Sequence, residues 1–151
     1  RAGGRGDPVS QRCWEEVKEG ETLPGFSLEL TMTRMVQQVS GTQDFYPIHH
    51  DRDFARSGGH PDIFVNTAFT RAALCRLLTD WAGPAGFVKR LGFQMRRYHL
   101  LGDTMHVRGK VVKKYRQDGV GAVDLEIWAE NAREGIATPG TATVHLPLRS
   151  T

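Results

Sequence analysis

Two side chains of the stretch QDFYPIHHDRDFA, residues 43–55, could take part in one reaction: the carboxylate of Asp44 and the imidazole of His49. Pro47 lies between them and excludes a regular helix through this stretch, so both side chains can point into one pocket. A carboxylate and an imidazole that hold one water molecule can orient it, remove its proton and pass that proton on. On residue types alone, a turn cap and a surface histidine are the commoner interpretation of such a pair.

The neighbouring residues His50, Asp51 and Asp53 are interpreted as helix-capping and surface residues, because acids are favourable at the start of a helix. The sequence offers no third ligand at a spacing that would make a metal site of the two adjacent histidines. We therefore expect no metal and no bound cofactor. The remaining histidines are interpreted as ordinary strand or loop residues: His60, His99, His106 and His145.

The elements that must position Asp44 and His49 begin with a strand and a short helix. Residues 26–32 alternate apolar and polar side chains, which predicts a half-buried strand. In residues 33–41 the apolar spacing becomes helical, with Thr33 as the expected N-cap and Gly41 as the expected end. Residues 49–59 predict one further short helix, which closes at two glycines.

The longest expected helix is NTAFTRAALCRLLTDWAGP, capped by Asn66 or Thr67 and ended by Gly83 and Pro84. Its apolar residues cover more than one face, so other structure must surround it. Four runs of strand periodicity follow, in residues 90–100, 104–116, 122–131 and 141–148. One strand, one apolar helix and four antiparallel strands predict an α+β domain in which an antiparallel sheet is wrapped around a central helix.

The composition is that of a single globular domain: 151 residues, 39% hydrophobic and 25% charged, with a net charge of +3. Residues 1–13 are rich in Gly and Arg and are expected to form a flexible N-terminal arm, and residues 14–151 to form the domain. Cys13 and Cys75 have no metal-ligand spacing and suggest reduced thiols in the cytoplasm. We expect neither membrane insertion nor nucleic-acid binding, because the sequence has no bilayer-length apolar run and no basic run interleaved with aromatics.

Several landmarks together resemble the MaoC-like hotdog domains, a family that includes the (R)-specific enoyl-CoA hydratases. They are WEEVKEGETLPG, TRMVQQVSGTQDFYPIHHDRDFA, DIFVN, LLGDT, RGKVV and GTATVHLPL, and they extend over residues 14–148. The family pattern is close to G-D-x-N-P-x-H-x-D-x-x-x-A, and its acid, proline and imidazole fall on Asp44, Pro47 and His49. The motifs HHDRD, DIFVN and TDWAGP resemble more narrowly the small subunit of the heteromeric hydratases of bacterial steroid side-chain degradation.

The resemblance implies a single hotdog fold and the reversible addition of water to a trans-2-enoyl-CoA, with a steroid side chain or another large acyl group. His49 is expected to deprotonate the water, while Asp44 orients the water and stabilises the charged imidazole. The thioester oxygen is expected to meet backbone N–H groups at the start of the central helix, around Asn66 and Thr67. CoA enters only as part of the substrate.

The sequence departs from the family pattern at three positions. Tyr46 stands where the pattern has Asn, and Gln43 replaces the Gly before the aspartate. Asn66 occupies the place where many members have Gly at the entry of the central helix, and its Cβ affects how closely a thioester can approach.

Two other functions compete with hydration. A non-catalytic hotdog subunit could complete the acyl-CoA pocket of another chain, although the presence of both Asp44 and His49 speaks against that role. A hotdog thioesterase would need a carboxylate on the central helix, and residues 66–79 contain none; Asp80 comes only at the far end. Because a single hotdog sheet exposes a strand edge, we also expect pairing with a second, non-identical hotdog subunit, with a homodimer as the alternative.

Overall fold

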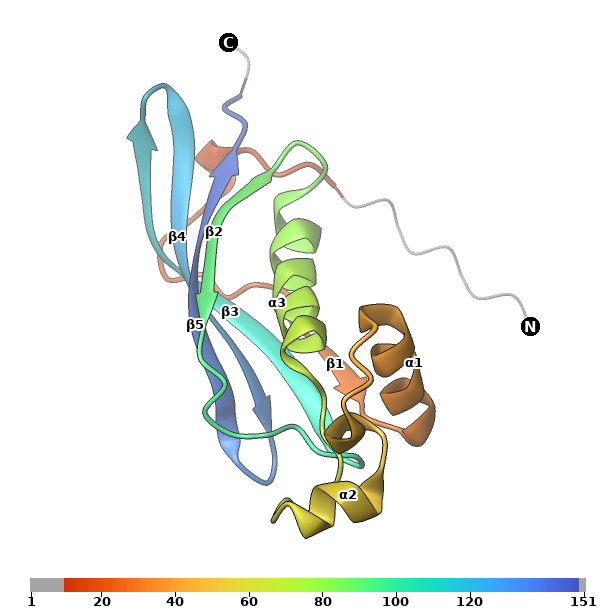
Figure 1. The fold of residues 1–151 in the computed structure, drawn as a ribbon. Coiled ribbons are helices and arrows are strands. Elements are labelled where there is room, and N and C mark those ends of the chain that lie inside the picture. The colour runs from red at the N-terminus through yellow and green to blue at the C-terminus, as the bar shows by residue number, and fades with distance from the viewer. Residues whose placement is uncertain (1–9, 150–151) are drawn as a thin grey trace, which may run out of the picture.

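A five-stranded antiparallel sheet curls around one long helix in the computed structural model, which describes residues 10–149 (Figure 1). The strand order is β1-β3-β4-β5-β2, so the first two strands along the chain form the two edges. The strands are β1 (Phe26–Glu29), β2 (Phe87–Phe93), β3 (Thr104–Gln117), β4 (Val120–Asn131) and β5 (Gly135–Leu146), and the long helix is α3 (Thr67–Ala82). This confirms the predicted α+β hotdog fold.

The core lies between α3 and the concave face of the sheet. Leu74, Leu77 and Leu78 of α3 are buried, and they pack in one cluster with alternate residues of β3 and β4, such as Val107 and Ile127. Burial of each such side chain contributes about 1.5–3 kcal/mol. The alternation read from the sequence thus places one face of each strand against the central helix, as predicted.

The segment between β1 and α3 carries the motif of residues 43–55. It contains α1 (Met32–Thr42), a 3₁₀ turn (Pro47–His49) and α2 (Arg52–Ser57), which lie beside the N-terminal end of α3 (Figure 1). Two predicted boundaries of α1 were wrong. Its N-cap is Thr31, whose hydroxyl accepts from the Arg34 N–H at 3.2 Å, and it continues through Gly41 to Thr42. The prediction for Asp51 holds, because its carboxylate caps α2.

The strand predicted over residues 90–100 is displaced toward the N-terminus. β2 begins at Phe87 and ends at Phe93, and the chain then leaves regular pairing while Gln94 N–H still donates to the Pro139 carbonyl at 2.9 Å. Residues 98–101 instead lie against the segment before α3, where Phe64 and Leu100 form an isolated bridge. The apolar period read from the sequence therefore ran past the end of the strand.

The structure describes only the last part, residues 10–13, of the predicted N-terminal arm of residues 1–13. Residues 1–9 lie outside the described residues, whereas residues 10–13 are attached to the end of α3. The Gln11 side chain donates to the Ala82 carbonyl at 3.0 Å and accepts from the Ala85 N–H at 2.7 Å. The described helices include none that is long and apolar enough to cross a membrane.

Candidate active site

The structure brings Asp44 and His49 together. The 3₁₀ turn that Pro47 begins folds the chain back, and the carboxylate Oδ2 of Asp44 lies 3.4 Å from Nε2 of His49. The His49 side chain is only 10% exposed, whereas that of Asp44 is 41% exposed. The imidazole therefore lies at the inner side of the pair and the carboxylate at the solvent side.

A backbone carbonyl determines which nitrogen of His49 faces Asp44. Nδ1 lies 2.8 Å from the Phe64 carbonyl oxygen, which can only accept, so Nδ1 carries the proton of the neutral ring. Nε2 then presents a lone pair toward the carboxylate. Two acceptors at this separation can be bridged by a water molecule that donates one O–H to each.

A pocket of about 380 Å³ opens at this pair. Its lining consists of Asp44, His49, residues 64–68, Arg71, Met95 and Tyr98. The rings of Phe64 and Tyr98 pack with their centroids 4.3 Å apart and give the pocket an apolar wall. An acid–imidazole pair beside an apolar wall suits a substrate with an apolar body and a polar reacting end.

The N-terminal end of α3 contributes to the lining of the same pocket. Asn66 does not offer its backbone there, because its N–H donates to Oε1 of Gln38 at 3.1 Å. Its side chain caps the helix by accepting from the Phe69 N–H at 2.8 Å. Among residues 10–149, no acceptor meets the N–H groups of Thr67 and Ala68, and both residues line the pocket.

Of the two residues predicted to offer backbone N–H groups, Asn66 has its N–H paired with Gln38 and Thr67 has no acceptor among residues 10–149; their oxyanion role stays a prediction. The expectation was the backbone around Asn66 and Thr67; the available donors are those of Thr67 and Ala68. An N-capping residue lies outside the first helical turn. The prediction of Asn66 as a possible cap therefore already implied that the free N–H groups begin at Thr67. The contact from Gln38 on α1 could not be read from the sequence.

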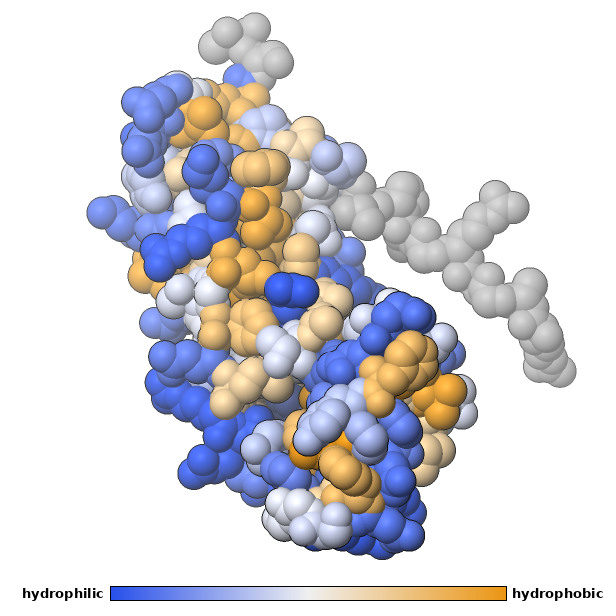
Figure 2. All heavy atoms as spheres, in the orientation of Figure 1, coloured by the Kyte–Doolittle hydropathy of each residue, from blue (hydrophilic) through white to orange (hydrophobic). Residues whose placement is uncertain are grey.

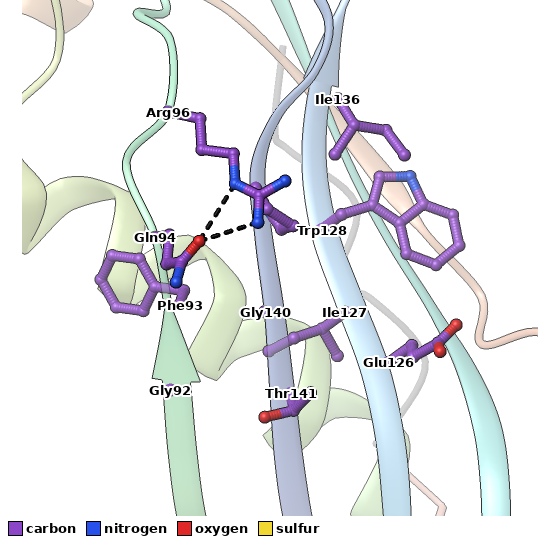
Figure 3. A pocket seen from close by; sticks show the side chains of 11 residues that line it. Gly92, Phe93, Gln94, Arg96, Glu126, Ile127, Trp128, Ile136, Gly140 and Thr141 are labelled. Atoms are coloured by element: carbon purple, nitrogen blue, oxygen red, sulfur yellow. Dashed lines mark hydrogen bonds between the residues drawn. The ribbon is translucent and has the colours of Figure 1, made fainter.

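A second hollow of about 520 Å³ lies on the sheet, away from the acid–imidazole pair (Figure 3). Gly140 permits the close approach of β2 and β5 there, since a Cβ built on it would lie 2.6 Å from the Gly92 carbonyl oxygen. The Arg96 guanidinium at the rim of the hollow is bonded to Gln94 at 2.9 and 3.0 Å.

Within residues 10–149 no group of three His, Cys, Asp or Glu side chains is placed to hold a metal ion.

Comparison with known proteins shows the family to which this chain belongs. A model of the MaoC-like domain family matches residues 18–131. The 3-oxo-4,17-pregnadiene-20-carboxyl-CoA hydratase beta subunit of Mycobacterium tuberculosis is 34% identical over 130 residues, which cover 86% of this chain and 95% of that protein.

Two solved structures are also similar. A chain of the ChsH1–ChsH2 complex of M. tuberculosis has a TM-score of 0.77 and 30% identity, with coverage of 85% of this chain and 98% of that chain. The (R)-hydratase of A. caviae involved in PHA biosynthesis has a TM-score of 0.78 over 88% of this chain and 99% of that chain. At 19% identity, the second match shows the fold alone.

Proposed function

Because this chain belongs to the MaoC-like domain family, we propose that it is an enoyl-CoA hydratase that adds water reversibly to a trans-2-enoyl-CoA thioester. The observation that carries the proposal is the pair of acceptors, Asp44 Oδ2 and His49 Nε2, 3.4 Å apart in a pocket at the start of α3. Such a pair is suited to hold a water by both of its protons and to remove one of them.

In the proposed reaction His49 Nε2 takes a proton from the water as its oxygen attacks Cβ of the substrate. The carboxylate of Asp44 keeps the other O–H in place and stabilises the imidazolium that forms. The proton then passes to Cα, so that OH and H add across the double bond. The enolate-like charge on the thioester oxygen is held by the N–H groups of Thr67 and Ala68 at the helix start. The proposed step uses only these protein groups, the water and the substrate, of which CoA is a part.

A bulky acyl group, such as a steroid side chain, is the proposed substrate class. The relative from M. tuberculosis is the beta subunit of a 3-oxo-4,17-pregnadiene-20-carboxyl-CoA hydratase. In this chain Phe64, Met95 and Tyr98 supply an apolar pocket wall, and the two residues that follow Asp44, Phe45 and Tyr46, are exposed. An apolar ring system can be covered by such a surface while the thioester reaches the polar end.

We further propose that the chain works with a second, non-identical hotdog subunit. The relative is named a beta subunit, and one of the similar structures is a complex of two proteins. Within the described residues β1 and β2 each pair on one side only, which leaves two strand edges for a partner. A homodimer is the alternative for the same edges.

Two other functions are weaker. A subunit that only completes the pocket of its partner agrees with the beta-subunit name of the relative, so the assay below includes this outcome. A thioesterase with a carboxylate on the central helix is disfavoured. Asp80 is the sole acid of α3, lies near its C-terminal end, and is paired with Arg76 at 3.2 Å outside the pocket.

The test is the loss of the conjugated thioester absorbance with a short and a steroid-type 2-enoyl-CoA. The chain is assayed alone and together with a candidate hotdog partner. We expect His49→Ala to lower kcat by about 10²–10⁴, the usual contribution of a positioned general base. The matched control is His50→Ala, since the adjacent His50 is exposed and its side chain contacts the Phe45 carbonyl at 3.0 Å. Full turnover by His49→Ala would assign the chemistry to the partner.

A further inference from the structure

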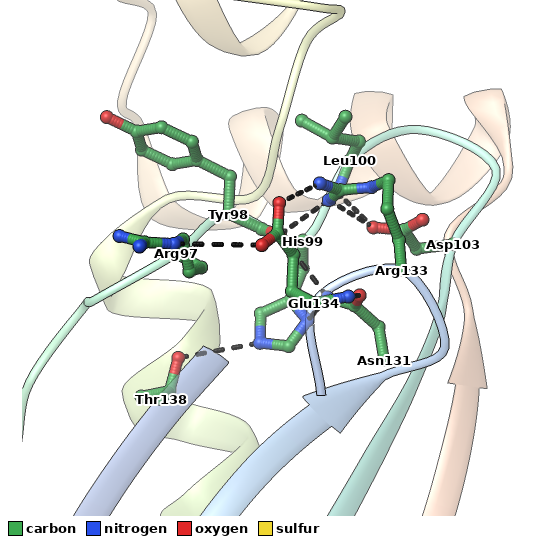
Figure 4. A network of polar contacts seen from close by, with 9 residues as sticks. All are labelled: Arg97, Tyr98, His99, Leu100, Asp103, Asn131, Arg133, Glu134 and Thr138. Carbon is green, nitrogen blue, oxygen red and sulfur yellow. Dashed lines mark hydrogen bonds and ion pairs between the residues drawn. The ribbon is translucent and has the colours of Figure 1, made fainter. Parts of the chain in front are cut away.

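His99 is a histidine that the pocket does not contain, and its side chain is completely buried at 0% exposure. Both ring nitrogens have partners (Figure 4): Nδ1 lies 3.0 Å from Nδ2 of Asn131, and Nε2 lies 3.4 Å from the Thr138 hydroxyl. An amide nitrogen can only donate, so Nδ1 of His99 is the acceptor and Nε2 carries the proton. His99 lies between β2 and β3, which agrees with its interpretation as a strand or loop residue.

The bonds around His99 are neutral ones at ordinary pH. Burial lowers the pKa of His99 from its usual 6.5 to about 4, although the nearby Asp103 opposes this shift and Arg133 adds to it. Asp103 and Arg133 face one another at 2.9 Å and hold the adjoining backbone: Asp103 accepts from the Leu100 N–H, and Arg133 donates to the Tyr98 carbonyl. Segment 98–101 is thus fixed at three successive residues.

This segment pairs with the one that orients the active-site imidazole. The Val65 N–H donates to the His99 carbonyl at 3.1 Å, and the Leu101 N–H donates to the Ile63 carbonyl at 2.9 Å. Phe64 lies between these two bonds, and its own carbonyl accepts from His49 Nδ1 at 2.8 Å. A displacement of residues 98–101 therefore moves the acceptor that determines the direction of the His49 lone pair.

We propose that His99 is a positioning residue for the hydration reaction: its bonds to Asn131 and Thr138 hold segment 98–101, which holds the Phe64 carbonyl against His49. The inference rests on the proposed function, because it assigns His99 a role only through His49. His99 itself touches neither the pocket nor a reacting atom. Thr138 also connects His99 directly to the pocket, since its hydroxyl lies 3.9 Å from the sulfur of the pocket residue Met95.

The test uses two variants of the full chain. His99→Asn keeps an acceptor near the Nδ1 position and loses the donor to Thr138, and Thr138→Val removes the hydroxyl at nearly constant volume. The matched control is Thr143→Val on the same strand, which loses a bond to Asp124 at 2.7 Å far from His49. A long-range ¹H–¹⁵N spectrum of the six histidines reports the tautomer of His49, assigned by the signal missing in His49→Ala.

We expect His49 to carry its proton on Nδ1 in the unaltered chain and in Thr143→Val, and to show mixed tautomers in His99→Asn and Thr138→Val. The same two variants are expected to lose about tenfold in kcat, a fraction of a general base's contribution, with KM changed less than about twofold. In a His49→Ala background, His99→Asn should lower the residual rate no further.

The outcomes separate the two proposals. An unchanged His49 tautomer and kcat in folded Thr138→Val would overturn the positioning role, even where His99→Asn fails to fold. Full activity of His49→Ala would overturn the proposed function instead, whatever the spectra show. Equal losses in kcat for Thr143→Val and Thr138→Val would mean a general effect on the fold and would also overturn the positioning role.

Discussion

At the scale of single residues, the proposed chemistry depends on which atom carries a proton. Nδ1 of His49 donates to the Phe64 carbonyl, so that Nε2 and the Asp44 carboxylate meet as two acceptors. The second buried imidazole, His99, has the opposite arrangement, with the proton on Nε2. The same residue type thus turns an acceptor nitrogen toward a pocket in one place and has both nitrogens paired inside the fold in the other, because the hydrogen-bond partners differ.

The depressed pKa of His99 predicts a pH dependence of stability. The folded state holds this ring neutral down to about pH 4, whereas the unfolded state takes up the proton near 6.5. The unfolded chain therefore binds more protons in this window, and the free energy of unfolding falls as the pH drops from 6.5 to 4. At about 1.4 kcal/mol per pH unit, His99 accounts for a loss of about 3 kcal/mol.

Urea unfolding of the unaltered chain and of His99→Asn from pH 7 to 4 measures this contribution. Carboxylates titrate in both proteins, so the difference between the two curves isolates His99. We expect that difference to shrink toward acid pH; parallel curves would contradict a neutral buried imidazole.

At the scale of elements, the turn from α1 into the motif requires a left-handed residue. Gln43 ends α1 with φ 56° and ψ 24°, a region that costs a residue with a Cβ about 1–2 kcal/mol. The family pattern has Gly at this position, and the structure supplies the physical reason. Gly41, by contrast, is a glycine inside α1, where a residue with a Cβ would be favoured. A Cβ built on it would have no atom within 4 Å.

Exchanging these preferences should stabilise the chain. We expect Gln43→Gly to raise the free energy of unfolding by about 0.5–1 kcal/mol, since part of the relieved strain is offset by a more flexible unfolded chain. Gly41→Ala should add about 0.5–1 kcal/mol through helix propensity. Gln43→Ala is the matched control, because it keeps the Cβ at positive φ and should give no gain. Urea unfolding of the unaltered chain and the three variants measures these free energies. A loss of stability in Gln43→Gly would contradict the strain argument.

At the scale of the whole molecule, the exposed apolar residues bear on association with other subunits. Apolar side chains gather over α1 and α2 (Figure 2), where Met32, Val36 and Phe54 are exposed. Phe87 is 61% exposed on the edge strand β2. An exposed apolar residue on an unpaired edge strand promotes aggregation of a lone subunit. In a pair of subunits it can be buried at the interface.

We expect Phe87→Lys to weaken association with the partner or a second copy by about tenfold, equivalent to about 1.4 kcal/mol. Val112→Lys is the control, because Val112 is 50% exposed but belongs to the internal strand β3. Sedimentation velocity over a concentration series measures both. A fully active monomer of the unaltered chain would contradict the pairing itself.

The sequence by itself predicted the number of strands, the central helix and the candidate pair Asp44 and His49, although the bounds of β2 and β5 differ from those predicted. Strand and helix periods are local patterns, and Pro47 acts within its own turn. Contacts between distant segments were decided only by the tertiary structure. Gln38 takes the Asn66 N–H across 28 positions, and so moves the available donors to Thr67 and Ala68. Helix α3 and the segments on either side of it must pack before such bonds exist, because no local pattern encodes which distant acceptor a buried N–H will meet.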